Sequence, residues 1–160
     1  MVEVKVWKLA MDGRTDTPVV ILREVGGQRI LPIWIGLAEA RAIAMELAGK
    51  RFQRPLTHDL IKTIIMGLDA TVRKVVICEL KDNTFYAKIY LEKGDEVVGI
   101  DARPSDSIAI ALRTKSPIYV AQQLFENQPI STEMSEEDQA ESLRKYLDDL
   151  SPEDFGNYPL

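Results

Sequence analysis

The stretches IGLAEARAIAMEL (residues 35–47) and IDARPSDSIAIAL (residues 100–112) decide the fold, because they resemble each other at an offset of 65 residues. Each stretch has the composition of a helix and follows three runs with the composition of β-strands. This shared order predicts an internal duplication of a β-β-β-α unit. The identical pairs are Ile35/Ile100, Ile43/Ile108, Ala44/Ala109 and Leu47/Leu112.

The strand runs are rich in valine, isoleucine and aromatic residues and are separated by turn residues. Gly26-Gly27 predicts a two-residue hairpin turn, and Pro32 predicts that its strand lies at a sheet edge or carries a bulge. Strands paired in hairpins, together with helices, predict an α+β fold with a largely antiparallel sheet and helices packed on it. The predicted strands cover residues 2–6, 18–25, 28–35, 72–80, 84–91 and 96–101, and the main helices cover residues 37–49, 57–67 and 104–112.

The composition is that of one ordinary globular domain, with 160 residues, 46% hydrophobic and 28% charged. A single cysteine excludes an intramolecular disulfide, and the start MVEVKV lacks the order of a signal peptide. No apolar run approaches the ~20 residues that span a bilayer. We therefore expect a cytoplasmic protein without a membrane segment, in which Trp7 and Trp34 serve as packing residues.

Charge divides the chain into a domain (residues 1–130) and an acidic C-terminal helix and tail (residues 131–160). The tail holds nine acidic and two basic residues, a net charge of −7, which leaves +2 for the domain from the total of −5. The sequence SEED at residues 135–138 has the form of a helix capping box. Because the domain is nearly neutral, nucleic-acid binding would require a local basic cluster.

The first polar cluster is RFQRPLTHD (residues 51–59), which contains the only histidine of the chain. His58 and Asp59 are candidate catalytic residues, since an imidazole can act as a general base near neutral pH. Arg54 and Thr57 are candidate phosphate ligands beside a predicted helix N-terminus. In the alternative interpretation, Thr57 and Asp59 only cap the helix and His58 is a solvated bystander.

The second polar cluster is DARPSDS (residues 101–107), at a predicted strand-to-helix junction. Asp101 and Asp106 are candidate catalytic residues and ligands for Mg²⁺ or Mn²⁺, because carboxylate oxygens bind hard divalent cations. Arg103 and Ser105 are candidate phosphate ligands. In the alternative interpretation, Ser105 or Asp106 caps the helix and Arg103 pairs with a carboxylate.

Three stretches together resemble the bifunctional nuclease family: RPLTHDLIKTIIMGL, VVICELKDNTFYAKIYL and IDARPSDSIAIALRTKSPIYV. The resemblance implies an α+β domain, and some plant members of the family are credited with both DNase and RNase activity. The chain departs from the expected pattern at Glu39-Ala-Arg41, where relatives often carry a small residue and a histidine. The motif positions that carry over are Arg54, Pro55, Thr57, His58, Asp59, Asp101, Arg103, Pro104, Ser105 and Asp106.

Three functions follow from these clusters. The first is a metal-dependent nuclease that hydrolyses DNA and RNA with little sequence preference, in which His58 activates water. The second is a non-catalytic regulatory module that binds a phosphate-bearing ligand or a protein. The third is a structural homo-oligomer in which the polar motifs cap helices. We expect self-association, and we predict that the two clusters meet, within one chain or across a homodimer.

Overall fold

The first β-β-β-α unit consists of β1 (Val2–Asp12), β2 (Thr17–Glu24), β3 (Ile30–Trp34) and α1 (Leu37–Leu47). The second consists of β4 (Thr71–Lys81), β5 (Thr84–Lys93), β6 (Glu96–Ala102) and α3 (Pro104–Thr114). These elements come from a computed structural model that describes residues 1–126. The predicted duplicated order and the α+β class are confirmed. The remaining elements are α2 (Thr57–Gly67) between the units, then β7 (Ile118–Val120) and α4 (Gln123–Glu126).

The seven strands of residues 1–126 belong to one sheet, in the order β3-β2-β1-β7-β4-β5-β6. Each unit is an antiparallel meander, and β7 lies between the two meanders. The β7 strand pairs antiparallel with β1 and parallel with β4. Because β7 pairs with the first strand of each unit, the two meanders flank it on opposite sides.

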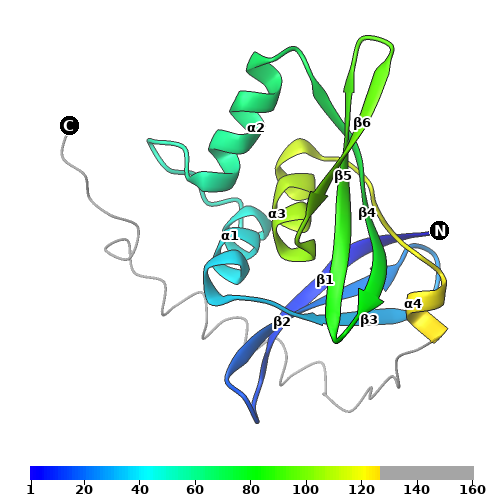
Figure 1. The fold of residues 1–160 in the computed structure, drawn as a ribbon. Coiled ribbons are helices and arrows are strands. Elements are labelled where there is room, and N and C mark those ends of the chain that lie inside the picture. The colour runs from blue at the N-terminus through cyan, green and yellow to red at the C-terminus, as the bar shows by residue number, and fades with distance from the viewer. Residues whose placement is uncertain (127–160) are drawn as a thin grey trace.

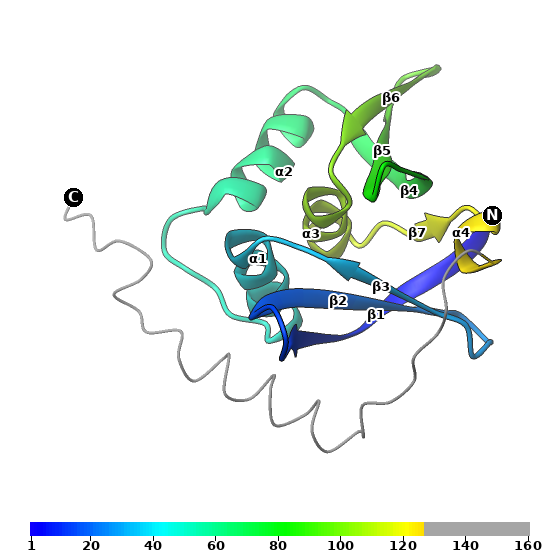
Figure 2. The same cartoon turned by 60° about the horizontal axis from the view of Figure 1, so that its bottom comes forward.

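Helices α1, α2 and α3 lie on one face of this sheet, and α3 packs against both of the others (Figure 1). Figure 2, turned by 60°, shows α3 in the angle between the two meanders. The core lies between these helices and the sheet. Ile43 of α1 and Ile108 of α3 are both fully buried in it, so the equivalent isoleucines of the two units have the same role. Proline at the first position of α3 begins that helix as predicted.

The two hairpins differ in how well the sequence predicts them. Asp82 and Asn83 form the turn between β4 and β5, with φ angles of 49° and 56°. The predicted two-residue turn at Gly26-Gly27 is wrong, because β2 ends at Glu24 and β3 begins only at Ile30. A bidentate ion pair between Arg29 and Glu24 closes this longer loop. Pro32 lies on β3, an edge strand, as predicted.

The predicted acidic helix and tail (residues 131–160) lie outside the described residues. Within residues 1–126, no helix is long and apolar enough to cross a membrane.

Candidate active site where three helices meet

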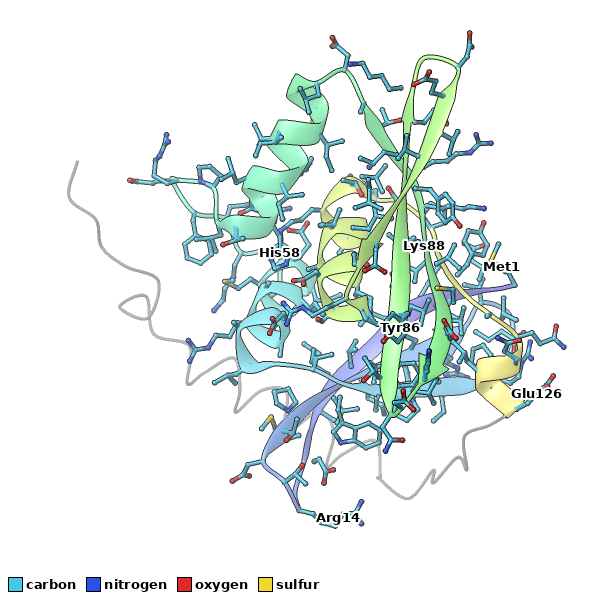
Figure 3. The ribbon with its side chains drawn as sticks, in the orientation of Figure 1. Met1, Arg14, His58, Tyr86, Lys88 and Glu126 are labelled. Atoms are coloured by element: carbon cyan, nitrogen blue, oxygen red, sulfur yellow. The ribbon has the colours of Figure 1, made fainter. Side chains whose placement is uncertain are left out.

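The two polar clusters of the sequence meet within one chain. His58 is the second residue of α2 and Asp106 the third residue of α3, and His58 Nε2 lies 2.9 Å from Asp106 Oδ1. Figure 3 shows His58 at the start of α2, on the side of the sheet where α1 and α3 lie. A carboxylate only accepts, so Nε2 carries the proton and Nδ1 presents its lone pair. In the described part of the chain Nδ1 makes no hydrogen bond, and it is open to act as a base.

Arg103 extends this contact toward α1. Its guanidinium donates to Asp106 Oδ2 at 2.8 Å and also donates to Glu39 Oε1. Glu39 lies in the first turn of α1, and Arg103 directly precedes α3. We call Glu39, Arg103, Asp106 and His58 the polar chain. The hydrogen bond to Asp106, followed by the one to Glu39, raises the pKa of Arg103, which keeps its positive charge at the site.

A second set of contacts, around Asp59 and Arg113, positions the helices. Asp59 Oδ1 accepts from Arg113 Nε at 2.6 Å, and Asp59 Oδ2 accepts from the Leu56 N–H at 3.0 Å. Arg113 also donates to the carbonyl oxygens of Ala109 and Ala42, and its side chain is only 4% exposed. Burial opposes ionisation of Asp59, but the Leu56 N–H and Arg113 outweigh burial and lower its pKa. One arginine thus ties α1, α2 and α3 together.

The contacts at the start of α2 show which roles Asp59 and Thr57 have in that helix. Both oxygens of Asp59 are occupied by the Leu56 N–H and Arg113, and its predicted catalytic role stays a prediction. The prediction that Thr57 caps α2 is wrong. Leu56 occupies the cap position, has no side-chain acceptor, and its own N–H is satisfied by Asp59. Thr57 lies exposed in the first turn.

Arg54 lies in the loop before α2, exposed to solvent, and forms no ion pair with any residue from 1 to 126. Its charge is available to a ligand, and its predicted contact with phosphate stays a prediction. Ser105, the second residue of α3, is buried.

Asp101 is not brought to the polar chain. On β6 it lies opposite Lys88 of β5, so both side chains share one face of the sheet. The neighbours of Lys88, Ala87 and Ile89, are buried in the core on the helix side. Asp101 therefore points to the other face, away from Asp106. Among the described residues no three His, Cys, Asp or Glu side chains are grouped to hold a metal ion.

The sequence does not predict that Glu39 pairs with Arg103, and it does not single out Arg113. Glu39 stands out in the sequence only as a departure from the family pattern. The available signal for Arg113 was a lone arginine at the end of an apolar helical run, IAIALRT. An arginine in that position requires buried acceptors, which here come from two other helices.

Comparison with known proteins identifies the family of this chain. The model of the bifunctional nuclease domain matches residues 20–133. An uncharacterised protein of Mycobacterium tuberculosis is 41% identical over 164 residues, covering 97% of this chain and 98% of that protein. The chain belongs to the bifunctional nuclease domain family.

Plant relatives carry a functional name. Bifunctional nuclease 1 of Oryza sativa subsp. indica is 30% identical over 119 residues, which are 72% of this chain and 36% of that protein. Bifunctional nuclease 1 of Arabidopsis thaliana is 29% identical over 107 residues, which are 64% of this chain and 33% of that protein. The matched part thus spans about a third of these plant proteins.

Proposed function

We propose that this protein is a nuclease that hydrolyses phosphodiester bonds of DNA and RNA with little sequence preference. The observation that carries the proposal is the hydrogen bond between His58 and Asp106, with Arg103 bound to the same carboxylate. This arrangement supplies a base and a phosphate-binding cation at one place. The family membership supports the same class of reaction.

In the proposed reaction, His58 Nδ1 removes a proton from a water molecule as the water oxygen attacks phosphorus. A new P–O bond forms, the P–O bond to the leaving oxygen breaks, and that oxygen takes a proton from solvent water, while the imidazolium of His58 returns its proton to solvent. Asp106 holds the required tautomer of His58 and stabilises the imidazolium that forms. Arg103 neutralises charge on the non-bridging phosphate oxygens, for which its planar donor geometry is suited.

Dependence on Mg²⁺ or Mn²⁺ is a separate part of the proposal, with Asp101 and Asp106 as the assigned ligands. The placement of these residues does not fit one shared ion, since Asp101 lies on the other face of the sheet. Both oxygens of Asp106 are already hydrogen-bonded. No catalytic step is therefore derived through a metal.

The test uses purified protein incubated with supercoiled plasmid and, separately, with total RNA, with and without EDTA. We expect both substrates to be cleaved, and His58→Ala to reduce the rate by ~10²-fold or more. Asp69→Asn is the matched control, because Asp69 lies exposed after α2 with φ 57°, a conformation that asparagine also tolerates. Cleavage that persists in His58→Ala would contradict the proposal. Absence of cleavage in the wild type would favour the regulatory module that binds a phosphate-bearing ligand or a protein.

Self-association also stays a prediction. The two clusters meet within one chain, so the site itself does not require a second copy. Sedimentation equilibrium of the full chain measures the oligomeric state directly.

A further inference from the structure

A pocket of about 340 Å³ lies beside the polar chain, between the ends of the two meanders. Trp34 and Gly36 line it from the β3–α1 junction, and Asn83 and Thr84 line it from the β4–β5 turn. Arg103 and Ser105 line it from the start of α3. Because Arg103 belongs to both, a ligand in this pocket lies next to the proposed catalytic residues. The volume is in the lower part of the range of small-molecule sites, ~300–1,000 Å³, which suits about one nucleotide.

The wall formed by α3 is suited to an anion. Ser105 is only 6% exposed, and its hydroxyl has no hydrogen-bond partner among the described residues. This hydroxyl is not among the completely buried side-chain atoms without a partner, which in residues 1–126 are Arg41 Nε and Ser107 Oγ. It lines the pocket instead, where it is a donor that a ligand can reach. The eleven-residue helix α3 begins with Pro104 and has no side-chain cap. Asp106 lies in its first turn, but both oxygens of that carboxylate are bound by His58 and Arg103.

The start of α1 lines the same pocket and, like α3, carries a carboxylate in its first turn, that of Glu39. The Glu39 carboxylate folds back against Gly36 so closely that no Cβ would fit there. That carboxylate already satisfies the positive end of α1. An anion in the pocket is therefore directed to α3, Ser105 and Arg103.

The wall formed by β3 is suited to a flat ring. Trp34 is 49% exposed, which corrects the expectation that it is a packing residue. Its indole Nε1 donates to Asp12 Oδ2 at 2.9 Å, and this bond fixes the orientation of the ring. A fixed and accessible indole is a platform on which a nucleobase can stack.

We propose that this pocket binds one nucleotide of a single-stranded nucleic acid, with its phosphate at Arg103, Ser105 and the start of α3 and its base on Trp34. The inference rests on the proposed function, since it names the form of the substrate at that site. Bases in a duplex are stacked on each other and do not reach Trp34. Single strands, or unpaired segments of DNA and RNA, therefore bind more tightly than duplex of the same length.

The test measures the Kd of a short fluorescein-labelled oligothymidylate by fluorescence polarisation. The His58→Ala protein is used as the background, so that the probe stays intact. In this background Trp34→Ala is expected to weaken binding by about tenfold or more, since stacking is worth ~1–3 kcal/mol per base. Trp34→Phe keeps an aromatic face and is expected to retain binding within about threefold. Trp34→Phe, like Trp34→Ala, cannot make the hydrogen bond to Asp12. A difference in binding between these two variants therefore reports the aromatic ring and not the loss of that hydrogen bond.

Trp7→Ala is the matched control. Trp7 is 38% exposed, but Lys8 and Arg23 lie over its ring, at 3.4 and 5.2 Å from the ring centroid. Equal losses in Trp7→Ala and Trp34→Ala, or a Trp34→Phe variant as weak as Trp34→Ala, would overturn the inference. Binding of a matched duplex as tight as that of the oligothymidylate would also overturn it.

The two proposals can fail separately. If Trp34 controls binding but the wild type cleaves nothing, the nucleotide pocket stands and the nuclease proposal fails. If the wild type cleaves single strands and Trp34→Ala changes neither KM nor binding, the pocket fails and the nuclease proposal stands.

Discussion

His58 Nε2 lies 2.9 Å from Asp106 Oδ1, although 48 residues separate the two in the chain. The side chains of His58 and Asp106 are 11% and 27% exposed, so the contact is sheltered but still reached from solvent. A histidine held in this way is fixed in both tautomer and orientation. That relationship generates the first prediction.

If His58 and Asp106 act as one unit, the reductions in cleavage rate caused by substituting each residue do not multiply in the double variant. We expect Asp106→Asn to lower kcat for nucleic-acid cleavage by ~10²-fold or more with little change in KM, because it disturbs the tautomer of His58. The double variant with His58→Ala is expected to be no slower than His58→Ala alone. Steady-state rates of the three variants measure this. A double variant slower by the product of the single effects would show that the two residues act independently.

Asp101→Asn is expected to leave the cleavage rate within about twofold of wild type. The reason is that Asp101 shares its face of the sheet with Lys88, opposite the helices. The rate is measured with Mg²⁺ and with Mn²⁺ over a range of concentrations. A loss of ~10²-fold that is relieved by higher metal concentration would instead support the assignment of Asp101 as a metal ligand.

Arg113→Met is expected to lower the free energy of unfolding by about 2 kcal/mol, since it removes the buried hydrogen bonds to the carbonyl oxygens of Ala109 and Ala42. The ion pair with Asp59 adds little, because that carboxylate is partly exposed. Urea denaturation measures this change. Arg73→Met is the matched control, because Arg73 pairs with Glu92 at 3.4 Å with its side chain 57% exposed. An exposed pair of this kind contributes less than ~1 kcal/mol. Equal effects of the two substitutions would contradict the role assigned to Arg113.

Asp59 makes stability depend on acid pH. Its pKa is lower in the folded protein than the ordinary value of 3.8, so its contribution is complete above that value. The contribution is lost as pH falls below 3.8 through the lower folded pKa. Asp59→Asn is expected to be less stable near neutral pH and to lose less further stability on acidification. Thermal melting from neutral pH to acid measures both slopes, and parallel slopes would contradict the prediction.

Glu39→Gln is expected to tighten binding of oligothymidylate, because Glu39 shares Arg103 with any phosphate in the pocket. Removing one negative charge beside a bound phosphate is worth about 1 kcal/mol in water, or about fivefold in Kd. Glu46→Gln is the control, since Glu46 also lies on α1 but pairs with Arg51. Weaker binding in Glu39→Gln would show that Glu39 mainly positions Arg103.

The sequence was a good guide wherever local pattern determines structure. The shared isoleucines at positions 43 and 108 predicted equivalent buried helices, and both are fully buried. Pro104 predicted a helix start, and the duplicated order predicted a largely antiparallel sheet, both confirmed. The meeting of His58 with Asp106 was also predicted, but with a contact across a homodimer left open, because α2 lies between the two units and has no counterpart in the duplication.

Other side-chain pairs between residues far apart in the chain could not be predicted from the sequence. No spacing pattern links Glu39 to Arg103 or Arg113 to Asp59, since these pairs depend on how three helices pack. Thr57 is a residue type preferred at the cap position of a helix. The last extended residue is Leu56, however, so Leu56 is the cap and Thr57 is already the first residue of α2. Trp34 was expected in the core, but it lies at the end of an edge strand and is half exposed.

The central position of β7 has a consequence during synthesis on the ribosome. Strands β1 and β4 each present an unpaired backbone edge until residues 118–120 emerge and insert between them. An open strand edge is a template for pairing with another nascent chain. This three-residue strand, the last along the chain within residues 1–126, thus closes both edges at once, and a chain released before residue 118 would leave the ribosome with both edges exposed to pairing.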